Sequence, residues 1–103
     1  MQDSFTLHCV TWNARAAMLE EVRATAYRMG LLTQAEAQTE PVDRQRLHAL
    51  VLNESGKAIG SARITPYGET ERLVVLEPEN QSKFEAALKL AAWLNEDRTL
   101  RYA

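Results

Sequence analysis

The chain has a single cysteine, Cys9, among 103 residues, with only three prolines, four glycines and no long apolar run. One thiol excludes an internal disulfide and any metal site built from several cysteines. No stretch approaches the roughly 18 apolar residues of a membrane-spanning helix, and the N-terminus has no basic segment followed by an apolar run. We therefore expect a cytoplasmic protein that does not enter a membrane, in which Cys9 serves as a small apolar strand residue.

Neither sign of charge dominates the composition. Twelve Lys and Arg residues stand against fourteen Asp and Glu residues, so the formal net charge is −2 and the pI is about 5.7. The two signs are interspersed, so the chain lacks the basic face that nucleic-acid binding requires. A quarter of the residues are charged and 46% are hydrophobic, which is typical of globular proteins. The length fits a single domain over residues 1–103.

The spacing of apolar residues predicts an α+β fold. Alternation predicts strands over 5–12, 47–53, 57–65 and 70–76, with a very short last strand over 99–102. Three- and four-residue steps predict helices over 14–29, 33–38 and 82–95, with Asn13, Thr33 and Ser82 as N-caps. The predicted architecture is an antiparallel sheet of about four strands with two main helices, in the order β-α-(α)-β-β-β-α-(β).

Three further expectations concern burial. The first helix presents an apolar stripe to the core and turns Arg23 outward; the stripe contains Met18, Leu19, Val22, Ala26 and Met29. Residues 31–46 form the most polar segment, so we expect a solvated connection there. The strand 73–76 is apolar on both faces and is predicted to be the most buried. His8 and His48 lie in different strands, and each is expected to be a hydrogen-bonded strand histidine.

The most distinctive run is Gly60-Ser-Ala-Arg-Ile-x-Pro66-x-Gly68-x-x-Glu71-Arg72-Leu-Val-Val-Leu76, and it follows Val22-Arg23, Glu40-x-x-Asp43 and His48. These residues and the order of the elements resemble the GNAT superfamily of N-acetyltransferases. The resemblance covers nearly the whole chain at the level of pattern. It implies an incomplete GNAT (acyl-CoA N-acyltransferase) fold, because the chain ends at Ala103, where the family's fifth strand would begin.

In that family a loop of the form [Arg/Gln]-x-x-Gly-x-[Gly/Ala] presents backbone N–H groups to the pyrophosphate of acetyl-CoA at the start of a helix. The resemblance implies that a cofactor would lie against Val74, Leu76, Gln81, Ser82, Lys83 and Ala86. Phe84 stands where the middle glycine belongs. A phenyl group there would occupy ligand space or turn into the core and alter the loop. We expect no cofactor, with acetyl-CoA as the ligand if the family activity is retained.

Catalysis and assembly depend on the same region. Glu71 matches a position where some members of the family place a base, and it is the one catalytic candidate. The alternative is that Glu71 is only a charged residue on the solvent side of its strand.

The strand Leu73–Leu76 becomes a sheet edge unless residues 99–102 or another chain pair with it, and apolar edges recruit partners. A homodimer is therefore expected, through this edge or through exchange of the C-terminal segment.

Three functions remain in competition. The first is a reduced GNAT-like domain with little or no catalysis that acts as a binding or regulatory module. The second is an active acetyl-CoA-dependent N-acetyltransferase that a dimer or a partner completes. The third is an unrelated small α+β protein-interaction domain whose strands imitate those of the family.

Overall fold

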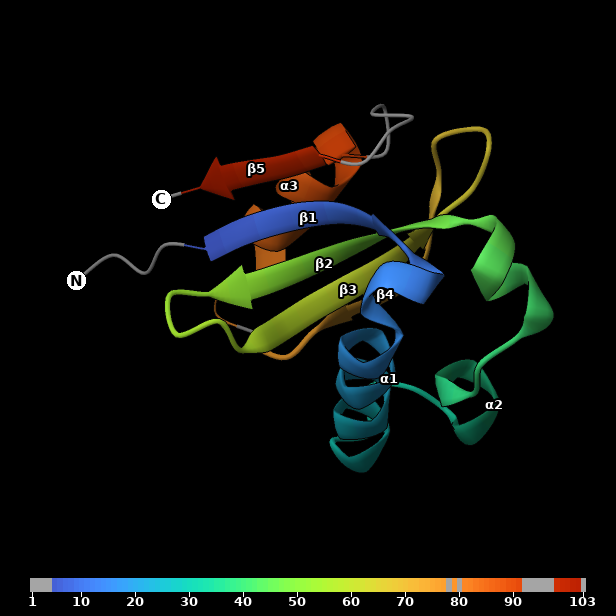
Figure 1. Cartoon of the computed structure of the whole chain (residues 1–103). Helices are drawn as coiled ribbons and strands as arrows, with labels where there is room; N and C mark the ends of the chain where they lie inside the picture. The colour runs from blue at the N-terminus through green and yellow to red at the C-terminus, as the bar shows by residue number, and fades with distance from the viewer. Residues whose placement is uncertain (1–4, 78, 80, 92–97, 103) are drawn as a thin grey trace.

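An antiparallel sheet organises the chain. The computed structural model describes residues 5–77, 79, 81–91 and 98–102, with the backbone alone for 88–91 and 98–102. Within these residues the sheet contains five strands, which are β1 (Phe5–Thr11), β2 (Leu47–Asn53), β3 (Ala58–Ile64), β4 (Thr70–Val75) and β5 (Arg98–Tyr102). The spatial order is β4-β3-β2-β1-β5, and every neighbouring pair is antiparallel (Figure 1). The predicted α+β class and antiparallel sheet are confirmed.

Helices cover both faces of the sheet. They are α1 (Trp12–Arg28), α2 (Gln34–Ala37) and α3 (Gln81–Ala91), with a short 3₁₀ helix, η1 (Pro41–Gln45). The helices α1 and α2 lie on one side of the sheet and α3 on the other (Figure 1). Because side chains alternate along a strand, the sheet contributes to a separate hydrophobic cluster on each face.

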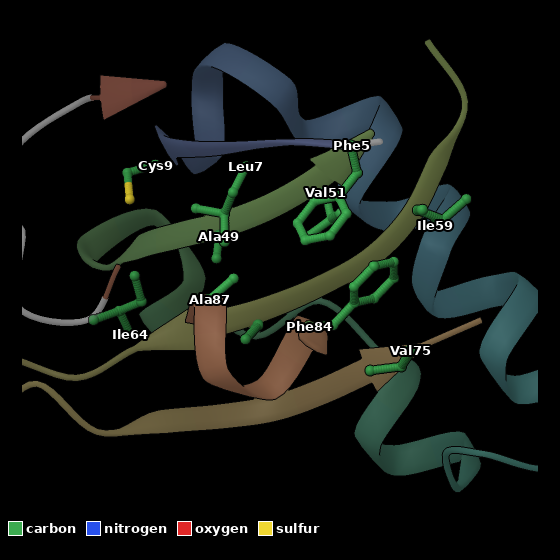
Figure 2. Close-up of a cluster of buried hydrophobic side chains, with 11 residues drawn as sticks. Phe5, Leu7, Cys9, Ala49, Val51, Ile59, Ile64, Val75, Phe84 and Ala87 are labelled. Carbon is green, nitrogen blue, oxygen red and sulfur yellow. The ribbon is translucent and has the colours of Figure 1, made fainter. Parts of the chain in front are cut away.

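The cluster beneath α3 is built around two phenyl rings. Phe5, Leu7 and Cys9 of β1 point into it at alternate positions, as predicted, and Phe84 and Ala87 enter it from α3. The rings of Phe5 and Phe84 meet edge to face with centroids 4.6 Å apart (Figure 2). This geometry is favourable for aromatic pairs. It joins the first strand to a helix that begins more than seventy residues later in the chain.

The cluster beneath α1 receives Leu19, Val22 and Ala26 from the helix and Leu50 and Val74 from the sheet. These three helical positions confirm the centre of the predicted stripe. Its C-terminal end is wrong, because Met29 follows the last helical residue and its side chain is 49% exposed.

The beginning of α1 also differs from the prediction. The helix starts at Trp12 with Thr11 as its N-cap, so Asn13 lies inside it. Arg15 has non-helical angles, φ −138° and ψ 30°, which kink the helix after its first turn. Trp12 is buried. We attribute the early start of α1 to this burial, because a helix that begins directly after β1 places the Trp12 indole over the sheet.

A prediction about strand burial is wrong. The most buried strand is β3, whose last six residues are all buried, whereas β4 is buried only at Val74 and Val75. The physical reason is position. The last strand, β5, pairs with β1 at the opposite side of the sheet, so β3 is flanked on both sides and β4 has a described neighbour on one side only.

A glycine within a strand is typical of a bulge or of the close approach of another backbone, and both are found at Gly60. Gly60 pairs with Val51, while Ala58 pairs with Leu52, so Ile59 is the extra residue of a β-bulge. A Cβ atom at Gly60 would lie 3.0 Å from the carbonyl oxygen of Val74. Glycine therefore allows β4 to approach β3 closely at this point.

The helix α3 begins at Gln81, one residue before the predicted cap at Ser82. Ser82 is thus the second helical residue, and position 80, where the cap would lie, is outside the described residues. The predicted continuation of this helix through 92–95 is also outside them.

Candidate functional site: a buried ionic cluster

Charged side chains from distant parts of the chain meet on the sheet face that α1 covers. We call this group the ionic cluster. Among the described residues it consists of three arginines and three carboxylates, namely Arg23, Arg63, Arg72, Glu40, Asp43 and Glu71.

Asp43 is the centre of the ionic cluster and is fully buried. Both carboxylate oxygens accept from the Arg23 guanidinium at 2.9 Å, and Oδ1 also accepts from Arg63 at 3.1 Å. The backbone N–H of Glu40 donates to Oδ2 at 2.7 Å. The predicted solvated connection is therefore wrong at this residue, because buried carboxylates are retained when charged donors surround them.

The environment sets the pKa of Asp43. Burial acts to raise it, but the hydrogen bonds from Arg23, from the Glu40 N–H and from Arg63 outweigh burial and hold the pKa well below the usual aspartate range. The pKa of Glu40 is also lowered, chiefly by hydrogen bonds from Arg63 and Arg72. Both groups are thus ionised near neutral pH.

Arg63 links three carboxylates. Its guanidinium donates to Asp43, to Glu40 at 2.9 Å and to Glu71 at 2.6–2.8 Å. Burial acts to lower the pKa of Arg63, but these hydrogen bonds raise it further above its ordinary value. Glu71, the sequence-predicted candidate base, is therefore held in an ion pair by Arg63. Its side chain is 39% exposed.

A second bulge brings Arg72 to the ionic cluster. Ser61 pairs with Val74 and Arg63 pairs with Glu71, so β4 has one residue more than β3 between these pairs. Arg72 has φ +54°, in the left-handed region that L-residues with side chains disfavour. Its guanidinium donates to Glu40 at 2.6 Å. Bulges re-aim side chains in this way, so neighbouring residues Glu71 and Arg72 both reach the cluster.

This backbone angle predicts an unusual order of stability at position 72. Arg72→Gly and Arg72→Ala both remove the ion pair with Glu40, but only glycine adopts the left-handed conformation without a steric penalty. We expect the glycine variant to be about 1 kcal/mol more stable than the alanine variant, the reverse of the usual order in a strand. Urea denaturation of the two proteins measures the difference, and an alanine variant of equal or greater stability contradicts the proposed origin of the strain.

His48 of β2 lies at one side of the ionic cluster and is only 1% exposed. Its Nε2 is 2.8 Å from the backbone carbonyl oxygen of Asp43. A carbonyl can only accept, so Nε2 carries the hydrogen. The other ring nitrogen, Nδ1, is buried and has no hydrogen-bond partner in the described part of the chain. The expectation of a fully hydrogen-bonded histidine is therefore wrong for Nδ1.

Trp12 closes the cluster beside His48. The two rings lie 5.2 Å apart between centroids, and the Arg23 guanidinium carbon is 5.0 Å from the centroid of the Trp12 ring. This is within the range of a cation–π interaction. Trp12, Arg23 and His48 are all buried, and their mutual packing accounts for a helix that begins so close to the sheet.

The sequence-predicted cofactor residues do not form one surface. Val74 is buried in the cluster beneath α1, whereas Gln81, Ser82 and Ala86 are exposed on α3. Leu76 is half-buried against the α1 side. The Lys83 ammonium lies 5.2 Å from the centroid of the Phe5 ring. Gln81 donates from its side-chain amide to Glu85 at 3.0 Å.

Phe84 decides between the two outcomes expected for a phenyl group in the loop. It is 1% exposed and packs in the cluster beneath α3, pointing from the helix toward Phe5 (Figure 2). The ring therefore turns into the core. This burial fixes the first turn of α3 against β1 and β3, because hydrophobic side chains of this size are costly to expose.

The prediction that Arg23 turns outward is wrong, because Arg23 is buried and paired with Asp43. Sequence reasoning missed it as a cluster residue, although a signal was present. Arg23 occupies the same helical face as Leu19, Val22 and Ala26, spaced by three and four residues. A charged residue within an apolar stripe indicates a buried partner. Arg63 gave no comparable signal, because only the structure shows that its strand, β3, is the most buried.

A cleft of about 520 Å³ lies apart from the ionic cluster, between α1 and the ends of β3 and β4. Val22 and Ile59 contribute apolar surface to it. Its charged residues are two of each sign, Glu21, Glu77, Arg28 and Lys57. The lining therefore selects no sign of ligand charge.

Two further properties limit the chemistry of the described residues. Among them no group of three or more His, Cys, Asp and Glu side chains is arranged to hold a metal ion. No helix in the described ranges has the length and apolar character needed to cross a bilayer.

The comparisons with known proteins return no match for this chain: no protein-family model, no curated protein and no solved structure is similar to it. Function is therefore inferred from the geometry of the chain itself.

Proposed function

We propose that this chain is a GNAT-like binding module with little or no catalysis, which forms a homodimer by pairing the Leu73–Leu76 edge of β4 with a second copy. The observation that carries the proposal is the position of β4. It is one of the two edge strands of the sheet among the described residues, with β5 at the other edge, and no described strand lies beyond it. Such edges present backbone donors and acceptors to other chains.

One hydrogen bond shows in which direction the backbone N–H and C=O groups of β4 point. The N–H of Leu76 donates to the carbonyl oxygen of Ile59 on β3 at 2.9 Å. Backbone groups of an antiparallel strand point alternately to its two neighbours. Leu76 and Val74 therefore face β3, while the backbone groups of Leu73 and Val75 face outward.

A two-fold symmetric pairing satisfies these outward groups. Antiparallel alignment of two β4 strands about Val74 places Leu73 of one copy opposite Val75 of the other, and the symmetry repeats the contact. The bulge at Arg72 interrupts the strand on one side, and charged Glu71 and Arg72 occupy that end. Bulges and charges discourage pairing, so the available edge is the apolar part, Leu73–Leu76.

Two contacts support the view that catalysis has been lost. Glu71, the one candidate base, is paired with Arg63, so it is not poised to take a proton from a substrate. Phe84 occupies core space beneath α3 instead of leaving bare main chain at the loop. A glycine at that position would allow close approach of a phosphate, whereas a buried phenyl group restricts the conformation of the turn.

Analytical ultracentrifugation tests the dimer. We expect a dimer for the wild-type protein and a folded monomer for Leu73→Lys, because a lysine beside the proposed two-fold axis places like charges close together. Leu73 also packs against the cluster beneath α3, so far-UV circular dichroism must show that this variant folds. Thr70→Lys is the matched control, since Thr70 lies on the same strand beyond the bulge, and this variant is expected to remain dimeric. A monomeric wild-type protein, or equal dissociation of both variants, contradicts edge pairing.

Titration calorimetry and thermal denaturation with acetyl-CoA test whether the cofactor binds, which acyl transfer requires. We expect no heat of binding and no change in the melting temperature. Binding together with turnover of acyl groups would instead support an active N-acetyltransferase that the dimer completes, and the proposed loss of catalysis would be wrong.

A further inference from the structure

We propose that His48 is an acid-sensitive latch, which holds residues 40–46 against the sheet when it is neutral and releases them when it is protonated. The inference is independent of the β4 edge and of the proposed loss of catalysis. It rests on how this segment is attached to the rest of the molecule.

The attachment of residues 40–46 is almost entirely polar. Asp43 is the one buried residue of η1, and in the described part of the chain no residue of 40–46 belongs to either hydrophobic cluster or packs against one. The segment is held by the ion pairs of Asp43 and Glu40 and by the hydrogen bond from His48 to the Asp43 carbonyl. A segment without apolar anchoring opens more readily than the core.

Protonation of His48 leaves the Nε2–H donor to the Asp43 carbonyl in place, so its cost arises at the other ring nitrogen. Protonation places a second N–H at Nδ1, where the buried ring has no partner within the described residues. A buried donor without a partner destabilises the closed form, and a charged donor does so more strongly. Opening of the segment relieves this cost, because it gives the imidazolium access to water.

The surrounding charges add to the effect. Arg23 of α1 and Arg63 of β3 act to lower the pKa of His48, while Asp43 of η1 acts to raise it. On β1 the residue opposite His48 is Val10, and His8 lies two positions further along the strand. When His48 is neutral, the charges of the three arginines and three carboxylates of the ionic cluster cancel. When His48 is protonated, the cluster and His48 together carry one uncompensated positive charge.

Burial is the largest cause that lowers the pKa of His48, and the Asp43 carbonyl and carboxylate only partly oppose it. The open segment therefore binds the proton more tightly than the closed one. Closure is most stable above the ordinary histidine pKa of 6.5 and weakens as the pH falls below it, until the pH reaches the lowered pKa of the closed form.

Amide hydrogen exchange tests the latch. The Glu40 N–H donates to the Asp43 carboxylate and the Asp43 N–H donates to the Glu40 carbonyl. Both bonds lie within the segment, but Arg23 and Arg63 hold the Asp43 carboxylate in the closed form, so release of the segment should weaken their protection. We expect their protection factors to fall between pH 7 and pH 5 by up to roughly 25-fold, the limit set by an open state that gains a proton on a group of ordinary pKa 6.5 while the closed state does not. The Leu31 N–H, bonded to Ala26 in the α1 region, is expected to keep its protection.

Two variants isolate the responsible imidazole, since His8 and His48 are the chain's only histidines. His48→Gln keeps an N–H donor for the Asp43 carbonyl but does not titrate, and its segment should stay protected at pH 5. His8→Gln should lose protection as the wild type does. A pH-dependent loss in His48→Gln, or an equal loss at Leu31, overturns the latch.

A measurement on the wild-type protein keeps the test decisive if His48→Gln does not fold. The ring ¹⁵N shifts of His48 should show the neutral form with hydrogen on Nε2 at pH 7, and the ring should titrate below the ordinary pKa of 6.5. A ring that titrates at the ordinary pKa of 6.5, or that carries its hydrogen on Nδ1, contradicts the proposal.

Discussion

Replacing Asp43 by asparagine is expected to lower the free energy of unfolding by about 3–5 kcal/mol. The reason is the charge that stays behind. Arg23 is 2% exposed and makes a bidentate ion pair with Asp43, and Arg63 also donates to this carboxylate. An amide cannot neutralise either guanidinium, so the variant leaves buried positive charge without compensation. Urea denaturation monitored by far-UV circular dichroism measures the loss.

Glu71→Gln is the matched control for this variant. Glu71 also pairs with an arginine of the ionic cluster, but its side chain is 39% exposed, so water replaces part of the lost interaction. We expect a loss of about 1 kcal/mol or less. Equal losses for Asp43→Asn and Glu71→Gln would show that burial does not set the energetics of the cluster.

A double variant identifies the origin of the loss. If the unpaired Arg23 causes most of it, adding Arg23→Met to Asp43→Asn removes the buried charge, and the double variant is destabilised by less than the two single losses combined. Additive losses would contradict this explanation.

The pH dependence of stability should follow the same carboxylate. The pKa of Asp43 in the folded protein lies well below the ordinary 3.8, so its contribution is complete above that value and is lost as the pH falls below it. The slope of unfolding free energy against pH between pH 5 and pH 3 should therefore be smaller in Asp43→Asn than in the wild type.

Phe84→Gly is expected to lower the free energy of unfolding by about 4–6 kcal/mol, because it empties a core site and places glycine inside a helix. Phe84 is 1% exposed and contacts Phe5 edge to face. The total stability of a small domain is about 5–15 kcal/mol, so the variant should lose a large fraction of its stability. Thermal denaturation and urea titration check this result.

Two variants separate the causes. Phe84→Leu keeps an apolar group in the site and should cost less than half as much. Ala86→Gly introduces glycine at an exposed position of the same helix and should cost about 1 kcal/mol. A Phe84→Gly protein as stable as the wild type would show that the ring does not fill the core.

The result at Phe84 also changes the meaning of the resemblance to the GNAT loop. Restoring a glycine at position 84 would open the main chain toward a phosphate only if the helix kept its place. Phe84 packs in one cluster with residues of β1 and β3, so its removal loosens the helix as well. Recovery of cofactor binding by this single change is therefore not expected.

Local patterns were sufficient to predict most of the elements. The turns with Gly56 and Gly68 have φ +82° and +81°, values that glycine adopts without strain. The capping box of Thr33 and Glu36 is formed. These features depend on residues within four positions of each other, so the printed order of the chain contains the information that they need.

The candidate site was only partly predictable. Glu40, Asp43, His48 and the run from Gly60 were recognisable as a pattern, but their meeting with Arg23 required the fold. A polar segment such as 31–46 is normally solvated, and the burial of Asp43 depends on donors that arrive from α1 and β3. Charge and spacing alone contain no information about such long-range partners.

The sequence by itself determined the order and type of the elements, the alternating faces of β1 and the positions of the tight turns, since each depends on short-range sterics and hydrogen bonds. The tertiary structure decided that β5 joins β1 and leaves β4 outermost, that Phe84 fills the core, and that Asp43 is enclosed by arginines. These outcomes depend on which distant surfaces bury each other most favourably, and that competition is resolved only when the whole chain packs.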